Sequence, residues 1–355
     1  MSAAQDIVNR LPMELLHMIA VQLCKQSLKS LSLVNGKFRV LCASYLFRTL
    51  EVPFSLSGFY RLEQVSLSQL AQHVKTVCYK APELIDPLVQ HWDYFSNCIY
   101  TPSEYVRDER DFCWDKGISY IGIHSYFSCL SQEQQGILRK NQDTRTIRAC
   151  LPRFSNLKTV KLSFIDGIKQ PFTWFGGRVF LDWKDSFPIH FETLIQGIIA
   201  ARRGGAVIRS FEVSGFYSRL AASDNGLSSM VADALYNVED LRLVDSPSLL
   251  EFMSTVTLAS VRRLELGSCW LCVPDLEKFV VSHAKSLQFL HLEDTWMPIE
   301  KVHYWGLSLC DSSAETILTN IACIRRCGIL QELTINKGST DRYQYHEVFD
   351  GFLAK

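Results

Sequence analysis

Three short stretches near the middle of the chain share one pattern: VEDLRL at 238–243, VRRLEL at 261–266 and LQFLHL at 287–292. In each stretch, apolar residues occupy the first, fourth and sixth positions. The alternation over the last three positions is typical of a strand that buries one face. The stretches start 23 and 26 residues apart. We therefore expect a regular succession of units that each contain one strand.

The same six-residue pattern occurs four more times, starting at Val74, Leu157, Ile208 and Leu330. The seven successive starts are separated by 83, 51, 30, 23, 26 and 43 residues. The shorter intervals resemble the ~20–29-residue period of leucine-rich repeats. The longer intervals are expected to be repeats that carry insertions.

Helical patterns lie between the strand patterns. Apolar residues form one helical face over residues 227–235, and Pro274 and Ser312 are favourable helix starts. Strand–helix–strand units with short connections build parallel sheets by right-handed crossovers. Stacked in order, they form a curved solenoid with parallel strands and outer helices.

The first fifty residues contain three helical patterns of a different kind. Leu15, Ile19 and Leu23 recur every four residues and form one apolar stripe. Ser27 is an expected N-cap of a second helix, and Asn35 of a third. Three helices of this length cannot bury so many apolar residues among themselves. We expect part of this surface to dock on another protein or on the rest of the chain.

These residues carry a family resemblance. The stretches LPMELLHMIAVQL (11–23) and LKSLSLVNGKFRVL (28–41) resemble an F-box, and LFRTL (46–50) is similar to the segment after that motif in many fungal F-box proteins. The family's F-box is a three-helix module that binds the Skp adaptor of cullin–RING ubiquitin ligases. The resemblance implies adaptor-facing or module-core positions, from which we take these adaptor-binding residues: Leu11, Pro12, Leu15, Leu16, Ile19, Leu23, Leu28, Leu31, Val34 and Phe38.

The two patterns together predict an α/β chain with two domains. Residues 1–50 are the expected F-box, and residues 51–355 are the expected leucine-rich-repeat-like, substrate-binding domain. The implied function is that of a substrate-recognition subunit of an SCF-type ubiquitin ligase, with the Skp adaptor, a cullin and an unknown target protein as partners. Such a subunit is not an enzyme, because it acts by holding its target beside the transfer machinery.

Two aromatic-rich stretches, at about 84–150 and 167–190, interrupt the repeats and are expected to be insertions. Aromatic side chains are favoured anchors at protein interfaces. The second stretch also carries a glycine pair and interleaved charges, as a loop projecting from a rigid scaffold would. We therefore take Phe172, Trp174, Phe175 and Trp183 as candidate substrate-binding residues. The alternative is that both insertions are buried against the repeats.

The composition argues against broad electrostatic binding of nucleic acid or membrane, because 37 basic residues balance 37 acidic ones. A local charged patch is compatible with that balance. No run of the chain approaches the ~20 apolar residues of a membrane helix. Asp6, Arg10 and Glu14 stand where a signal peptide would place its apolar core. We expect a cytoplasmic or nuclear protein.

The twelve cysteines include one pair with zinc-like spacing, Cys269 and Cys272, near His283 and His291. Cys269 also occupies the Asn/Cys position of the leucine-rich-repeat pattern, where it would point into the turn after the strand. A structural role is the better prediction, and we expect neither a metal nor a cofactor.

The chain lacks the common catalytic motifs, including G-x-G-x-x-G, the P-loop, H-E-x-x-H and G-x-S-x-G. Three alternatives to the ligase subunit remain. The first is an F-box scaffold outside any ligase. The second is an enzyme whose site, with His303, Asp311 and His346, is assembled across repeats. The third is a plain repeat module whose first helices cap the solenoid, so that the Leu15 stripe is buried within the same chain.

Overall fold

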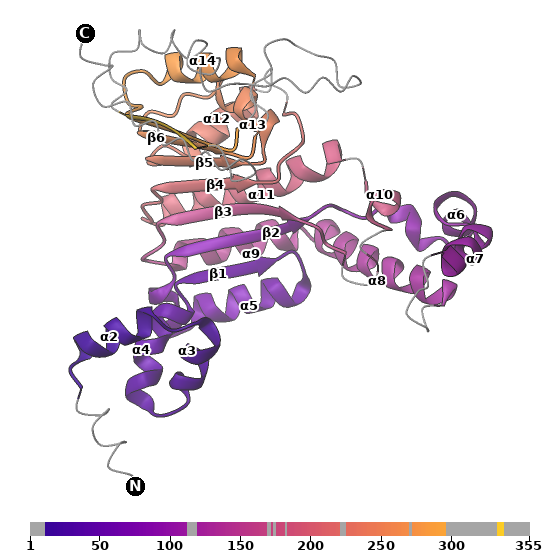
Figure 1. Cartoon of the computed structure of the whole chain (residues 1–355), viewed down its shortest axis with the longest axis horizontal. Helices are drawn as coiled ribbons and strands as arrows, with labels where there is room; N and C mark the ends of the chain where they lie inside the picture. The colour runs from indigo at the N-terminus through magenta and orange to yellow at the C-terminus, as the bar shows by residue number, and fades with distance from the viewer. Residues whose placement is uncertain are drawn as a thin grey trace.

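A parallel β-sheet forms the body of the protein (Figure 1). The computed structural model describes residues 11–111, 119–168, 172, 175–181, 183–220, 225–269, 272–295 and 332–336. Its eight strands lie side by side in sequence order, and every neighbouring pair is parallel. The strands are β1 (Thr49–Pro53), β2 (Thr76–Pro82), β3 (Thr159–Ile165), β4 (Ser210–Ser214), β5 (Asp240–Val244), β6 (Arg263–Gly267), β7 (Phe289–Glu293) and β8 (Glu332–Asn336).

Helices fall into three groups in Figure 1. A helical module at the N-terminal end of the sheet contains α2 (Met13–Val21), α3 (Lys25–Ser32) and α4 (Gly36–Leu46). One face of the sheet is covered by α5 (Leu56–Leu67), α9 (Gln142–Cys150), α11 (Trp183–Arg203), α12 (Asn225–Ala234), α13 (Pro247–Met253) and α14 (Val273–Ser282). A lobe projects to one side and contains α6 (Trp92–Tyr94), α7 (Pro102–Asp111), the first half of α8 (Tyr120–Arg139) and α10 (Gly176–Val179).

The strand predictions are confirmed, since each of the seven six-residue patterns ends in one of the strands β2–β8. The register also aligns them. The fourth positions of the seven patterns face one another across the sheet: Val77, Val160, Phe211, Leu241, Leu264, Leu290 and Leu333. A one-residue slip would turn each apolar row to the outside, so the shared pattern specifies this register.

Strand β1 is not among the predicted strands. Phe47, Leu50 and Val52 carry the same six-residue spacing, but the F-box resemblance places this segment in the tail of the expected module. Leu50 pairs with Val77 and is buried in the main core. The boundary predicted after residue 50 therefore falls inside β1, and the helical module ends at Leu46.

Several strands are followed by a residue in the left-handed region, namely Gly215 (φ 74°), Asp245 (49°), Ser268 (50°) and Asp294 (50°). At Gly215 a Cβ atom would also lie 3.1 Å from the carbonyl oxygen of Phe164. This conformation turns the chain out of the sheet at the same place in successive units. The turns therefore keep the helices on one side.

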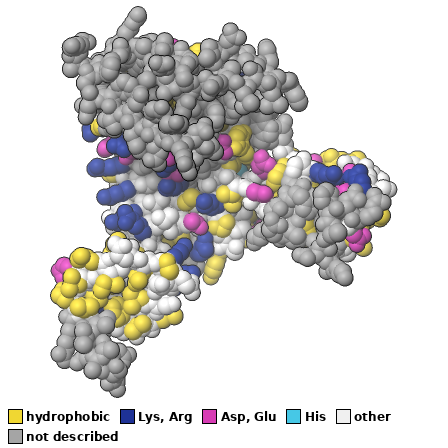
Figure 2. Space-filling view, viewed as in Figure 1, with side chains coloured by type: hydrophobic (Ala, Val, Ile, Leu, Met, Phe, Trp, Pro, Cys, Tyr) yellow, Lys and Arg dark blue, Asp and Glu magenta, His cyan; other side chains and the backbone are white. Residues whose placement is uncertain are grey.

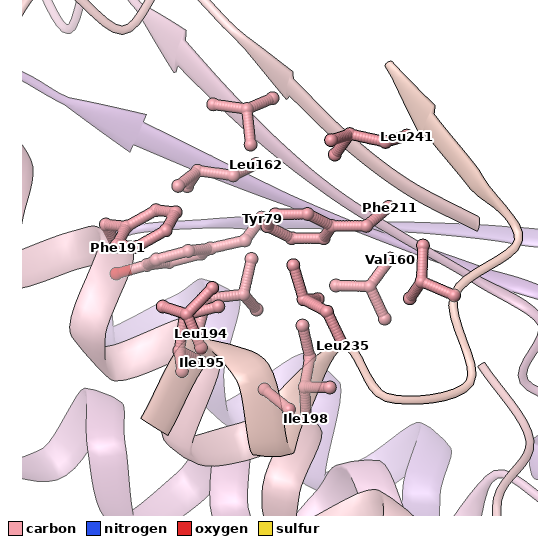
Figure 3. Packing of buried hydrophobic residues seen from close by; sticks show 14 of the residues in the cluster. Tyr79, Val160, Leu162, Phe191, Leu194, Ile195, Ile198, Phe211, Leu235 and Leu241 are labelled. Carbon is pink, nitrogen blue, oxygen red and sulfur yellow. The ribbon is translucent and has the colours of Figure 1, made fainter. Parts of the chain in front are cut away.

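The main core lies between the sheet and its helices (Figure 3). Phe211 and Leu241 come from neighbouring strands and share this core with Ile195 and Ile198 of α11. Full burial of a large apolar side chain stabilises the fold by about 1.5–3 kcal/mol. The helix predictions over residues 227–235 and after Pro274 are confirmed by α12 and α14, whereas the helix predicted after Ser312 lies outside the described residues.

The projecting lobe has a second hydrophobic core, and we call this part of the chain the aromatic lobe. Its buried residues come from the two predicted insertions: Ile85, Val89, Phe95, Ile99, Tyr100, Ile123, Phe127, Ile168, Phe175 and Val179. The two chain segments that enter it pair at their base, where the Leu181 N–H donates to the Leu84 carbonyl at 2.7 Å. Helices α9 and α11 pack on the main core instead, so the predicted insertions extend too far.

One of the two predicted N-caps in the helical module is confirmed. The Asn35 side chain caps α4 by accepting from the Phe38 N–H at 2.9 Å, as predicted. The predicted cap at Ser27 is wrong, because α3 begins earlier and the Cys24 thiol accepts from the Ser27 N–H instead.

Candidate functional site

One side of α2 presents apolar side chains to solvent. Leu15 is 44 % exposed, Ile19 47 % and Met18 67 %. Spacings of three and four residues put them on one helix face. An open depression of about 430 Å³, which we call the α2 groove, is lined by Leu11, Leu15, Met18, Ile19, Gln22 and Leu23. Figure 2 shows hydrophobic side chains gathered on the α2–α4 module.

The module keeps a small core beneath this surface. Leu16, Leu28 and Phe38 are buried there beside Leu41 and Cys42. A side chain that is buried inside the module cannot contact a partner while the module stays folded. The prediction that Leu16, Leu28 and Phe38 bind an adaptor is therefore corrected, since these three side chains hold the helices together.

The other predicted adaptor-binding residues divide into two sets. The α2 groove brings together four of them: Leu11, Leu15, Ile19 and Leu23. Pro12, Leu31 and Val34 do not line it, although Pro12 and Val34 are exposed. Sequence reasoning missed Met18, which lies three residues after Leu15 and continues the same stripe.

Polar contacts hold α2 against α4. The Nδ1 atom of His17 and the hydroxyl of Tyr45 are hydrogen-bonded at 2.8 Å. Lys37 Nζ donates to the carbonyl of Leu11 at 3.1 Å. Among the described residues that line the α2 groove, Gln22 is the one polar side chain. The residues that line the groove therefore carry no charge. They lie on a helix that is held in place by its contacts with α4.

Two of the residues predicted to bind a substrate, Phe172 and Phe175, have described side chains, and both pack in the aromatic lobe. Phe175 is fully buried, with its ring 4.9 Å from that of Phe127 and 4.8 Å from that of Tyr100. Phe172 is half-buried and stacks on Tyr126 at 4.4 Å. The prediction is wrong for Phe175, because its ring is needed in the core of the aromatic lobe.

The side chains of the two predicted tryptophans are outside the described part of the structure. Trp174 lies outside the described residues. Trp183 is the first residue of α11, and the structure does not describe its side chain. Phe172 and Phe175 thus pack in the separate core of the aromatic lobe, and not against the repeats as the alternative predicted.

The cysteine pair shows no metal site. Burial raises the pKa of the Cys269 thiol, which donates to the Gly267 carbonyl at 3.0 Å and accepts from the Ser246 N–H at 3.4 Å. Both ring nitrogens of His283 contact backbone groups, at Leu258 and Phe279. Within the described part of the chain, no three His, Cys, Asp or Glu side chains are grouped to hold a metal. Cys269 thus points into the turn after β6, as the repeat pattern predicted.

The structure reveals a buried polar pair that the sequence did not indicate. His190 of α11 and the hydroxyl of Tyr79 are hydrogen-bonded at 3.0 Å, and both residues are fully buried. The rings of Phe54 and Phe164 lie 4.7 and 6.2 Å from the imidazole. Burial lowers the pKa of His190 to about 3, because the loss of solvation of an imidazolium outweighs the opposing effect of a hydrogen bond to the Pro82 backbone. The pair has no access to solvent and is a structural feature.

We expect this histidine to make the protein acid-sensitive. Its folded pKa lies below the unfolded value of about 6.5, so the unfolded chain binds the proton more readily. The stabilisation is complete above pH 6.5 and is lost as the pH falls toward 3. Between pH 7 and pH 5 the free energy of unfolding should decrease by about 2 kcal/mol from this group alone.

Urea unfolding at a series of pH values checks this prediction. His190→Gln should remove that part of the pH dependence even though it lowers the stability at pH 7. The matched control is His91→Gln, which removes an exposed imidazole. An unchanged pH slope in His190→Gln would contradict the prediction.

None of the described helices is both long and apolar enough to cross a lipid bilayer. His303, Asp311 and His346, the residues of the predicted enzyme alternative, lie outside the described residues. Neither a scan of protein-family models nor a search of curated proteins finds a match to this chain.

Proposed function

We propose that this protein is a substrate-recognition subunit of an SCF-type cullin–RING ubiquitin ligase. In this proposal the α2–α4 module is an F-box, and the α2 groove binds the Skp adaptor. The observation that carries it is the combination of a module core with an apolar groove that no described residue covers. Exposed apolar surfaces of this kind mark sites of protein–protein interaction.

The plain repeat module, in which the first helices only cap the solenoid, is disfavoured. That alternative requires the apolar stripe of α2 to be buried by the same chain. Leu15 and Ile19 instead remain close to half exposed with the sheet and its helices in place.

The sheet would be the target-binding part, as a leucine-rich-repeat-like solenoid. Two features support this interpretation. The strands follow one another in sequence order with helices on one face. The Asn/Cys position after the strand is filled by buried polar residues in three successive units, Ser246, Cys269 and Thr295. In the first two of these units, the side chain accepts from a backbone N–H of the preceding unit.

The subunit would contribute no bond chemistry of its own. Holding a target beside the charged transfer enzyme makes the encounter effectively intramolecular and raises the local concentration of the target. The rate gain then depends on how firmly the two ends of the chain hold adaptor and target.

Substitution of Leu15 tests the proposal. Leu15→Asp should weaken binding of a purified Skp adaptor at least 100-fold, equivalent to about 3 kcal/mol, because a carboxylate would be desolvated in an apolar interface. Isothermal titration calorimetry with the full-length chain measures this change. The variant should fold normally, since Leu15 faces solvent.

Val40→Asp is the matched control, because Val40 is an exposed residue of α4 that does not line the groove. It should bind the adaptor like the parent chain. Leu16→Asp is unsuitable as a test, since Leu16 is only 3 % exposed and its loss would unfold the module. Unchanged adaptor binding by Leu15→Asp, or no binding by the parent, would overturn the proposal.

A second measurement distinguishes a ligase subunit from an F-box scaffold that acts outside any ligase. A ligase subunit should recover cullin together with the adaptor from its native cell, and Leu15→Asp should lose both proteins. Recovery of adaptor without cullin would favour the scaffold.

A further inference from the structure

A row of charged residues runs across the sheet where its strands begin, one residue before each of the strands β1–β6. We call this row the edge ladder. Its members are Arg48, Lys75, Lys158, Arg209, Glu239 and Arg262. Each backbone N–H donates to the carbonyl of the preceding member, at 2.8–2.9 Å. Neighbouring members therefore lie at the strand spacing of about 4.8 Å.

The basic members of the ladder are all exposed. Figure 2 shows dark blue side chains along this edge of the sheet, above the helical module. Arg209 forms an ion pair with Glu239 at 3.8 Å. Within the described residues, Arg48, Lys75 and Lys158 have no carboxylate partner. They form an uncompensated run of positive charge in a chain whose net charge is zero.

The outward face of the same sheet is different between β3 and β7, because its charged residues pair with one another there. Lys161 and Glu212 form an ion pair at 2.5 Å between β3 and β4. Arg242 pairs with Glu265 at 3.5 Å, and similar pairs continue toward β7. Charge on this part of the face is thus satisfied internally, whereas Arg48, Lys75 and Lys158 of the ladder are left for a partner.

We propose that the edge ladder binds an extended, acidic polypeptide segment of a partner protein. From Arg48 to Arg209 the ladder spans three strand spacings, about 14 Å, which an extended chain covers in about four residues. Acidic side chains along such a segment would face the cations directly. The identification of this segment as part of the ligase target rests on the proposed function. The binding of an acidic segment by the ladder does not.

Charge arrangement favours a polypeptide over a nucleic acid. Glu239 lies within the row, and its carboxylate would repel a continuous chain of phosphates. A polypeptide can place a neutral or basic residue at this position. The five basic residues of the ladder also neutralise few phosphates, and nucleic-acid affinity depends steeply on that number.

Charge reversal on the ladder tests the inference by fluorescence anisotropy at low ionic strength. The probe is a fluorescein-labelled peptide with a run of glutamates between glycine and serine residues. The full chain should bind it, and Lys75→Glu/Lys158→Glu should bind it at least tenfold more weakly. The affinity of the parent should fall with added salt more steeply than that of the variant.

The matched control is Lys140→Glu/Arg219→Glu, which makes the same charge change at exposed positions outside the ladder. It should bind within about twofold of the parent, provided that circular dichroism shows both variants folded. An equal loss in the control would show a general charge effect and overturn the proposal. So would the absence of peptide binding by the parent, or equal binding of a peptide with glutamine in place of glutamate.

Two further measurements separate the remaining outcomes. A single-stranded DNA oligonucleotide that binds the ladder more tightly than the peptide would make this a nucleic-acid surface and overturn the proposal. Leu15→Asp should retain peptide binding, since the α2 groove is a separate surface. Failure of the adaptor experiment and failure of the ladder experiment are therefore distinguishable.

Discussion

Phe211→Ala should lower the free energy of unfolding by about 3–5 kcal/mol. Phe211 is fully buried on β4, and its neighbours in register are Val160 and Leu241. Removing the ring leaves a cavity under the centre of the sheet. The neighbouring strands cannot move in to close it, because hydrogen bonds between the strands hold their backbones in place. Domains of this kind are typically stable by only about 5–15 kcal/mol, so the loss is a large part of the total.

Urea unfolding followed by circular dichroism measures this effect. Phe289→Ala is the matched control, because Phe289 lies on β7 on the opposite face, half-buried beneath the guanidinium of Arg263 at 5.1 Å. The control should cost about 1 kcal/mol or less. Equal losses in the two variants would contradict the assignment of faces that the shared strand pattern implies.

Phe175→Ala should destabilise the aromatic lobe by a similar amount, about 3–5 kcal/mol, without unfolding the sheet. Phe175 connects the two insertions, since its ring contacts those of Phe95, Tyr100 and Phe127. The lobe has a core of its own, so the damage should remain local. In hydrogen exchange, amides of α7 and the first half of α8 should lose protection while those of β3–β5 keep it.

Phe172→Ala is the matched control, because the Phe172 ring is half-buried at the margin of the same core. Its effect on lobe amides should be clearly smaller. If Phe175→Ala instead reduced protection throughout the sheet, the lobe and the sheet would be one cooperative unit. The result also separates a structural from a binding role for Phe175, since a residue that only bound a target could be truncated without loss of stability.

The helical module shows which residues of the α2 groove can be predicted from the sequence pattern. The four-residue recurrence of Leu15, Ile19 and Leu23 is enough to predict an apolar stripe. It does not distinguish Leu15 from Leu16, because both are leucines on an amphipathic helix. The packing of α3 and α4 decides which of the two faces solvent. Substitution of Leu15 therefore tests docking, whereas substitution of Leu16 tests folding.

Strand β1 shows a different limit. The spacing of Phe47, Leu50 and Val52 is present in the sequence and is sufficient to predict a strand. The resemblance of the preceding residues to an F-box instead places the segment in the wrong unit. The pairing of Leu50 with Val77 shows that this stretch belongs to the sheet.

The sequence by itself determined the parallel sheet, since a repeated apolar spacing dictates strand, buried face and register within a few residues of chain. Only the tertiary structure decided that the two aromatic insertions share one core and that His190 meets Tyr79. The physical reason is the range of the interactions. Periodicity acts between neighbours along the chain, whereas these juxtapositions join residues separated by tens of positions and exist only once the strands are stacked.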